Sequence, residues 1–238
     1  MKSYKNILIT RPEPDSSTLC EMIVNAGSVA HAVPTIAIRS ITPGKTDIDA
    51  CSHADIIIFV SRNAARCGIG YMNKNARTFA VGQGTASTLQ ESDIDNVEVP
   101  KNFNSEALLA MPELVDVQEK AIVIMAGKGG RDLLEKTLKA RGAKVHKVAV
   151  YERILPEFSQ AQLESVFETI IPDAIVCTSV ESLENLVKCA VKFKATLLQL
   201  ALVVISPRIA DHAKKLGFQE ILLAASASNQ AIIEALNL

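Results

Sequence analysis

The sequence predicts an α/β protein built on parallel β-sheets that helices cover on both faces. Short apolar runs rich in β-branched residues alternate with stretches of helical periodicity. Most of these runs are continuously apolar, which is typical of strands buried on both faces. The order of strand, short loop and helix is the pattern of βαβ units. Strands are predicted at Ile7–Thr10, Ile56–Val60, Thr78–Val81, Ala121–Met125, Ala174–Thr178, Ala201–Ile205 and Glu220–Leu223.

The helices between these strands carry start and stop signals. Hydroxyl or carboxylate side chains can cap their first turns, and glycines at positions 27, 142 and 217 end three of them. At Ser206-Pro207 a capping serine precedes a proline at the first helical position. The predicted helices begin at Asp15 or Ser16, at Ser105, at Arg131, at Ser206 and at Ser228.

Two stretches, Val33–Ile41 and Val145–Ile154, are predicted to be unusually long extended segments. Each lies shortly after a helix-ending glycine. The segment Gly27–Val33 also matches Gly142–Val148 at its Gly, His and Val positions. We interpret this likeness as two half-molecules of similar topology, with the extended stretches at their boundaries.

Composition excludes several classes of function. The chain has 238 residues, enough for two domains of about 100 residues each. Its formal net charge is −1 and it has no Trp, so neither a basic surface nor a stacking platform for nucleic acid is predicted. The five cysteines are scattered, and no apolar run is long enough for a signal sequence or a membrane span. We expect a cytoplasmic protein with no membrane contact, a monomer by default.

Polar and cationic residues follow most of the predicted strands. In open parallel sheets, ligands bind beyond the carboxyl ends of the strands, where helix N-termini carry a partial positive charge. Arginine can bind a carboxylate with two parallel hydrogen bonds, so we predict a site for a ligand with several separate acidic groups. The predicted binding residues are Thr10, Arg11, Ser61, Arg62, Gly82, Thr85, Lys128, Gly129, Arg131, Ser179, Ser206 and Arg208.

A simpler interpretation exists for any single loop, because Ser, Thr and Gly are common helix caps and turn residues. The repeated cations at strand ends favour a binding site, since capping does not require them.

Motifs for cofactors are weak. Gly127–Arg131 lacks the spacing of a phosphate loop, and Gly82–Ser87 lacks the third glycine of a dinucleotide motif. The four histidines show no metal-ligand spacing, so neither a metal nor a cofactor is predicted.

An ordered set of segments adds a resemblance that covers nearly the whole chain. These segments are Ile7–Pro12, Phe59–Ala64, Ala80–Ala86, Ser105–Leu109, Gly127–Leu134, Arg141–Ala143, Val150–Arg153, Thr178-Ser179 and Val203–Ser206. Together they resemble the uroporphyrinogen-III synthase family, and the enteric bacterial branch in particular.

The resemblance implies two doubly wound α/β domains joined by a two-stranded β-ladder, with the N-terminal βα unit packed into the C-terminal domain. Residues 1–36 and 155–238 would form one domain and residues 37–154 the other, with the active-site cleft between them. Val33–Ile41 and Val145–Ile154 would then be the connecting strands.

The resemblance also implies a substrate and a reaction. Hydroxymethylbilane is a linear tetrapyrrole with acetate and propionate arms on every ring. The family reaction expels its terminal hydroxyl, inverts ring D and closes uroporphyrinogen III for haem biosynthesis, without a cofactor.

Tyr151 matches the family tyrosine proposed to assist departure of the hydroxyl. A phenol can take this role because it keeps its proton at neutral pH and can donate it. The alternative role is packing at the domain boundary. A transient contact with the preceding synthase is also expected.

Two other functions stay open at this stage. A two-lobed binding protein would also have paired α/β domains, and it would leave the product isomer unchanged. A nucleotide-dependent sugar or phosphoryl transferase could use Gly127–Arg131, and it would depend on nucleotide or a divalent metal.

Overall fold

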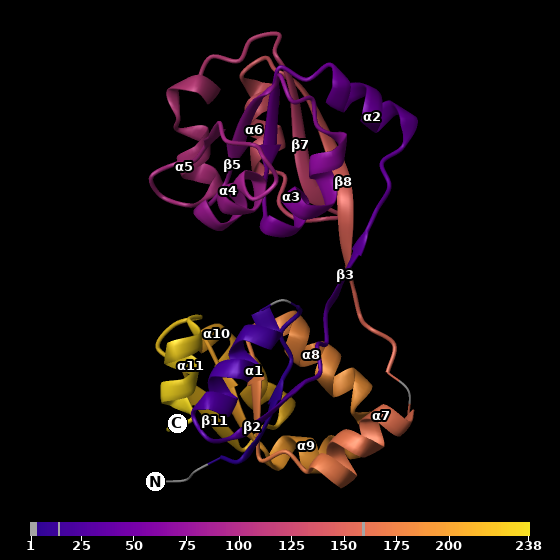
Figure 1. Cartoon of the computed structure of the whole chain (residues 1–238), viewed down its shortest axis with the longest axis vertical. Coiled ribbons are helices and arrows are strands. Elements are labelled where there is room, and N and C mark those ends of the chain that lie inside the picture. The colour runs from indigo at the N-terminus through magenta and orange to yellow at the C-terminus, as the bar shows by residue number, and fades with distance from the viewer. Residues whose placement is uncertain (1–3, 14, 159) are drawn as a thin grey trace. The chain divides into compact units, whose positions relative to one another are not determined.

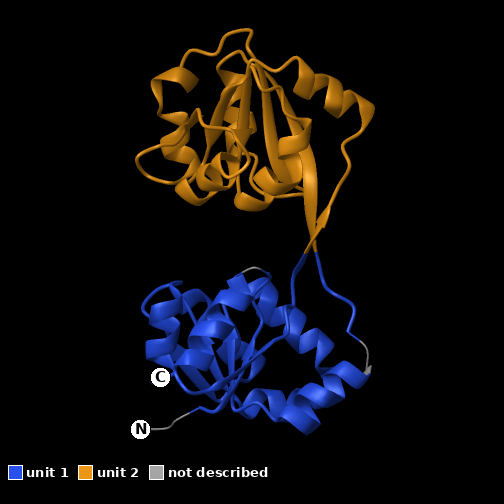
Figure 2. Cartoon of the chain, in the orientation of Figure 1, with its two compact units in different colours: residues 1–37, 154–238 blue, residues 38–153 orange. Residues whose placement is uncertain are grey.

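The computed structural model describes residues 4–13, 15–158 and 160–238. The chain divides into two compact units (Figure 2): unit 1 comprises Met1–Ala37 and Ile154–Leu238, and unit 2 comprises Ile38–Arg153. The chain therefore passes between the units twice, within strand β3 (Ala37–Ser40) and at the end of strand β8 (Lys144–Ile154). Each unit has its own sheet, in which the strands other than β3 pair in parallel, and this confirms the predicted fold class of two α/β units.

The sheet of unit 1 has the strand order β11-β10-β9-β1-β2, and the neighbouring strands are parallel (Figure 1). Its strands are β1 (Asn6–Ile9), β2 (Val29–Ala32), β9 (Ala174–Cys177), β10 (Ala201–Val204) and β11 (Glu220–Leu223). Its helices are α1 (Asp15–Asn25), α7 (Gln160–Glu164), a π-helical segment (Ser165–Ile170), α8 (Val180–Cys189), a 3-10 turn (Val191–Phe193), α9 (Lys194–Gln199), α10 (Pro207–Leu216) and α11 (Asn229–Ala235).

Both faces of this sheet are buried, which explains its continuously apolar strands. Successive strand residues point to opposite faces. Leu8 packs in a core with Leu183 of α8 and with α10, whereas Ile7 packs in a second core with Leu19 of α1 and with α11. Each fully buried aliphatic side chain contributes about 1.5–3 kcal/mol relative to an exposed one.

The sheet of unit 2 has the strand order β3-β8-β7-β4-β5-β6. Helices α3 and α4 pack on one face, and α5 and α6 contribute to the core on the other. Its remaining strands are β4 (Ile56–Phe59), β5 (Arg77–Ala80), β6 (Val97–Glu98) and β7 (Ala121–Gly127). Its helices are α2 (Lys45–Ser52), α3 (Arg62–Gly68), a 3-10 turn (Ile69–Tyr71), α4 (Gln83–Gln90), α5 (Ser105–Leu109), a second 3-10 turn (Pro112–Leu114) and α6 (Leu133–Ala140).

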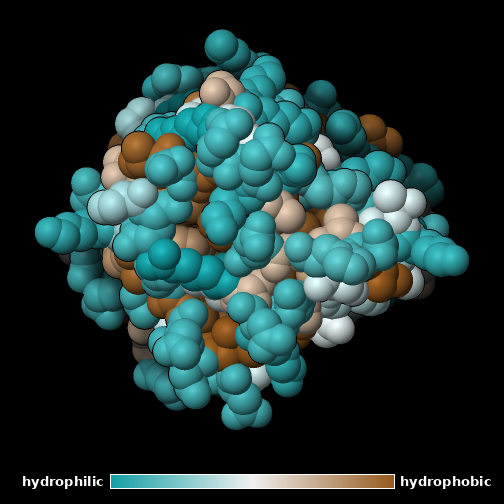
Figure 3. All heavy atoms as spheres, turned by 90° about the horizontal axis from the view of Figure 1, so that it is seen from above, coloured by the Kyte–Doolittle hydropathy of each residue, from teal (hydrophilic) through white to brown (hydrophobic). Residues whose placement is uncertain are grey.

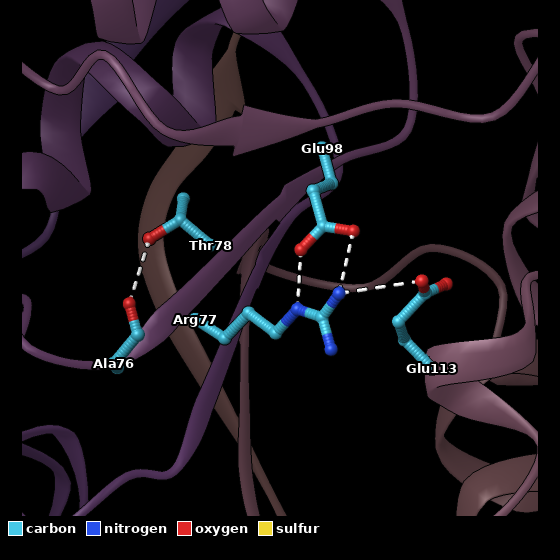
Figure 4. A network of polar contacts seen from close by, with 5 residues as sticks. All are labelled: Ala76, Arg77, Thr78, Glu98 and Glu113. Atoms are coloured by element: carbon cyan, nitrogen blue, oxygen red, sulfur yellow. Dashed lines mark hydrogen bonds and ion pairs between the residues drawn. The ribbon is translucent and has the colours of Figure 1, made fainter.

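An ion-pair network ties the short edge strand β6 to this sheet (Figure 4). Arg77, the first residue of β5, donates from Nε and Nη2 to the carboxylate of Glu98 in β6. Its Nη2 also lies 3.3 Å from Oε1 of Glu113. These side chains are partly exposed, so each pair contributes about 0–1 kcal/mol, and their main effect is to fix the position of β6.

The predicted extended stretch Val33–Ile41 is wrong as a single strand. β2 ends at Ala32 and β3 begins at Ala37. Pro34 lies in the break, where its missing N–H and fixed φ interrupt a sheet ladder. The internal likeness between the two halves has a structural counterpart, because β1-α1-β2 and β7-α6-β8 are both parallel βαβ units.

The face of the molecule that is seen from above the view of Figure 1 is mainly hydrophilic. Apolar residues show on it as separate areas among hydrophilic ones (Figure 3). No helix in the described ranges is both long and apolar enough to cross a bilayer.

Candidate functional site

In each sheet the strand order reverses at one point, and ligands of open α/β sheets bind in the crevice beyond it. In unit 1 the reversal lies between β1 and β9, and in unit 2 it lies between β4 and β7. Thr10 and Ser179 follow the strand pair of unit 1, and Ser61 follows β4 in unit 2. Several of the predicted binding residues are therefore close to these reversal points.

The ring of Tyr151 lies at the reversal point of unit 2. Its phenol oxygen is 3.2 Å from Oγ of Ser61, the second residue after β4. The ring packs against Gly127, the last residue of β7, so closely that a Cβ there would lie 3.0 Å from the phenol oxygen. With 4% of its surface exposed, Tyr151 is held between the ends of the two strands.

A bulge in β8 gives Tyr151 this position. The register of β8 against β7 shifts at Gly127, which pairs with Tyr151, so Val150 is an extra residue in the ladder. Adjacent strand residues normally point to opposite faces, but Val150 and Tyr151 both belong to the core on the α3 side. The N–H of Lys128 donates to the carbonyl of Tyr151 at 2.7 Å and fixes the bulge.

The N-terminus of α4 lies next to two exposed side chains. Gly82 is its N-cap, and a Cβ there would lie 3.6 Å from Cβ of Phe103. A Cβ on Gly84 would lie 3.4 Å from Cδ of Arg62, so the arginine stem runs along this end of the helix. Thr85, by contrast, is buried within α4. Of the residues predicted here, Arg62 and Gly82 thus face outward and Thr85 does not.

A cluster of charges lies beside the glycine-rich loop after β7, with Lys128 from the loop, Glu152 from β8 and Arg39 from β3. Glu152 accepts hydrogen bonds from Nε and Nη2 of Arg39 at 3.0 and 2.7 Å, and its other carboxylate oxygen lies 3.6 Å from Nζ of Lys128. The Arg39 guanidinium, and secondly Lys128, hold the pKa of Glu152 below its usual value. Two cations around one carboxylate leave a net positive charge. Gly129, with φ +81°, and the exposed Arg131 continue the loop.

In unit 1 a cavity of about 670 Å³ brings together Ser179 and Arg208, which the sequence predicted from separate loops. It lies between the N-terminus of α8 and helix α10. His212, which also lines it, has Nε2 3.2 Å from Oε1 of Glu184. The lining residues are Ser179, Val180, Glu181, Arg208, Asp211, His212 and Lys215.

The side chains of Thr10 and Arg11 form hydrogen bonds with other residues of unit 1. The hydroxyl of Thr10 is completely buried and lies 2.8 Å from Oγ of Ser182. Arg11 donates to Oδ1 of Asn229 at 2.6 Å and to a backbone carbonyl at 2.7 Å. These contacts hold β1 to α8 and to the start of α11, while the substrate-binding role of both residues stays a prediction.

The three predicted serines all serve as helix N-caps. Ser61, Ser179 and Ser206 accept hydrogen bonds from backbone N–H groups three residues later, at 3.1, 3.0 and 3.4 Å. The structural interpretation of these residues therefore holds. It does not exclude ligand binding, because a hydroxyl that accepts a capping bond can still donate its own proton.

Sequence reasoning did not single out Arg39, Glu152, Phe103 or His212 as site residues. Glu152 had a local signal, since it directly follows Tyr151, but its two cationic partners come from distant segments. In the part of the chain that the structure describes, no group of three or more His, Cys, Asp or Glu residues is placed to hold a metal ion.

Comparison with known proteins gives a consistent result. The family model described as uroporphyrinogen-III synthase HemD matches residues 17–234. The uroporphyrinogen-III synthase of Salmonella typhimurium is 32% identical over 97% of this chain and 99% of the relative, and that of Escherichia coli is 30% identical over the same shares. The crystal structure of the Helicobacter pylori uroporphyrinogen-III synthetase has a TM-score of 0.64 at 16% identity, with 97% of each chain covered, and this likeness shows the fold.

The fold, the polar strand ends and these relatives define an α/β enzyme of tetrapyrrole biosynthesis. The resemblance noted from the sequence is thereby confirmed. The chain belongs to the uroporphyrinogen-III synthase family.

Proposed function

We propose that this chain converts hydroxymethylbilane into uroporphyrinogen III, with loss of water and inversion of ring D. The observation that carries the proposal is the match to the Salmonella typhimurium uroporphyrinogen-III synthase over almost the full length of both chains. As a pathway enzyme it would act in the cytoplasm and receive its substrate from the preceding synthase by transient contact.

The charges at the strand ends suit a substrate with eight carboxylate arms. Arg62 and the Arg39–Glu152–Lys128 cluster supply exposed positive charge in unit 2, and Arg208 lines the cavity of unit 1. Positioning and electrostatic stabilisation can direct a reactive substrate without a strong nucleophile. The role of the protein is then to hold one conformation of the tetrapyrrole, in which ring D inverts before closure.

Tyr151 is the residue proposed to assist the chemical step. Its phenol would donate a proton or a hydrogen bond to the hydroxyl of hydroxymethylbilane, which leaves as water. Ser61, 3.2 Å away, can exchange a hydrogen bond with the phenol, and its own position is fixed by the capping bond from the N–H of Ala64. The closed packing around the ring fixes the direction of the phenol C–O bond.

The test is the isomer of the product. Purified protein is incubated with freshly prepared hydroxymethylbilane, the products are oxidised to porphyrins, and the type I and type III isomers are separated. We expect type III to predominate, whereas a protein-free control gives type I. Type I alone in the presence of folded protein would overturn the proposal, and tight substrate binding in that case would indicate a binding protein. Loss of activity after EDTA treatment and desalting would instead favour a metal- or nucleotide-dependent transferase.

A further inference from the structure

Phe103 is a large apolar side chain with 60% of its surface exposed. It lies outside the four buried cores of the described residues. Its backbone is well fixed, because the N–H of Asn104 bonds to the carbonyl of Asn102 and the Asn104 side chain caps α5 at 2.7 Å. The segment thus presents the phenylalanine ring outward without using it for packing.

The position of this ring sets it apart from other exposed apolar residues. β6 runs parallel to β5, so the segment after β6 lies at the carboxyl edge of the sheet, where Gly82 begins α4. Cβ of Phe103 is 3.6 Å from the point where a Gly82 Cβ would be. The stem of Arg62 runs along the same helix end at Gly84. An apolar ring, a guanidinium and helical N–H groups therefore surround one small area.

The apolar ring matches the flat ring of a substituted pyrrole, and the guanidinium and the helical N–H groups match its acidic arms. A pyrrole ring is flat and π-rich, and it packs well on a phenylalanine face. Its acetate and propionate arms are anions, which helix N-termini and arginine bind. We propose that Phe103 is a substrate-binding residue, on which one pyrrole ring of the tetrapyrrole stacks while its acidic arms reach the α4 N-terminus and Arg62. This inference rests on the proposed function and adds a residue to it.

A single tryptophan tests the contact directly. The chain contains no Trp, so Phe103→Trp introduces one fluorophore at the proposed site. The probe is uroporphyrinogen III under reducing conditions, whose pyrroles are not conjugated to one another and so do not absorb tryptophan emission. We expect saturable quenching or a spectral shift on binding. The control is Val115→Trp, which is 53% exposed and lies two residues from Glu113, a contact of Arg77 at the amino edge of the sheet.

Kinetics supply the second measurement. Phe103→Ala is expected to raise KM by roughly two- to tenfold with kcat nearly unchanged, and Phe103→Tyr should restore KM, because an aromatic face contributes this much to binding. Because Phe103 is exposed, we expect each variant to fold as the wild type does, and an unchanged circular dichroism spectrum checks this. Wild-type KM in Phe103→Ala, or no emission change in Phe103→Trp beyond that of Val115→Trp, would overturn the inference. Either result leaves the proposed function intact as long as the wild type makes the type III isomer.

Discussion

The ring of Tyr151 packs so closely on Gly127 that a Cβ atom at position 127 would lie 2.6 Å from the ring carbon Cζ. Real Cβ contacts are not this short, so any larger residue at position 127 must displace the ring. Only glycine at the end of β7 therefore permits the hydrogen bond between the phenol and Ser61. The sequence shows this glycine only as part of a loop that resembles a phosphate-binding motif.

Gly127→Ala should lower kcat by about 10- to 100-fold, because a displacement of about 1 Å in a catalytic group can have an effect of this size. Turnover of hydroxymethylbilane and the melting temperature are measured together. Gly70→Ala is the matched control, since nothing lies within 4 Å of a Cβ at position 70. Equal activity in the two variants would show that the close packing on Tyr151 has no catalytic consequence.

Tyr151→Phe should lower kcat by a factor on the order of 10², while the product stays mostly the type III isomer. The substitution removes the proton donor but keeps the ring that fills the space beside Gly127. Tyr71→Phe serves as the control, because Tyr71 is a partly buried tyrosine of the same unit. A kcat equal to that of the wild type in Tyr151→Phe would remove the phenol from the mechanism.

Lys128→Ala should raise KM and weaken the dependence of KM on salt, since the substrate would lose one attracting cation. Lys139→Ala provides the comparison, because Lys139 pairs with Glu135 within α6, away from the strand ends. Steady-state kinetics at two or more ionic strengths distinguish the two variants. An identical salt dependence of KM in both would argue against substrate binding by Lys128.

Thr10→Val should destabilise unit 1 by about 1–3 kcal/mol, because it removes a buried hydroxyl that donates to the carbonyl of Val176 at 2.9 Å and lies 2.8 Å from Oγ of Ser182. Urea unfolding measures the change. Thr46→Val, at an exposed position of α2, should stay within about 0.5 kcal/mol of the wild type. A similar small effect at Thr10 would mean that the buried hydroxyl cluster adds nothing to stability.

The buried phenol of Tyr4 should make stability fall at high pH. Burial, and secondly the hydrogen bond to Glu220 at 2.7 Å, raise its pKa from 10.0 to about 12. A pKa raised in the folded state favours folding below pH 10, and this contribution is lost as the pH rises toward 12. The difference in unfolding free energy between wild type and Tyr4→Phe should therefore shrink by up to about 2 kcal/mol over this range. A pH-independent difference would contradict the assignment.

The sequence predicted the fold class because the information is local. Continuously apolar runs marked the strands buried on both faces, and Ser206 and Gly217 marked the two ends of α10, where Gly217 has φ +100°. The break at Pro34 could have been anticipated from proline's missing N–H. The edge strand β6 could not, because Val97–Glu98 is two residues long and is held by Arg77 from a different segment.

The candidate site was predicted as residue types and not as contacts. Which strands become neighbours is decided by the packing of the whole sheet, so the sequence does not show that Arg39 meets Glu152 or that Phe103 meets Gly82. Local patterns also do not distinguish a capping hydroxyl from a binding one. Ser61, for example, both caps α3 and contacts the phenol of Tyr151.

The position of β1 between β2 and β9 has a consequence for the chain while it is being synthesised. β2 follows β1 closely in the sequence, but Ile7 also pairs with Ala174 of β9. The second side of β1 is therefore paired only after β9 has left the ribosome, whereas unit 2 forms from the continuous segment Ile38–Arg153. At about 5–20 residues per second, the intervening stretch takes on the order of ten to thirty seconds to translate. During synthesis unit 2 can therefore fold first, while one side of the apolar strand β1 stays unpaired until β9 has been made.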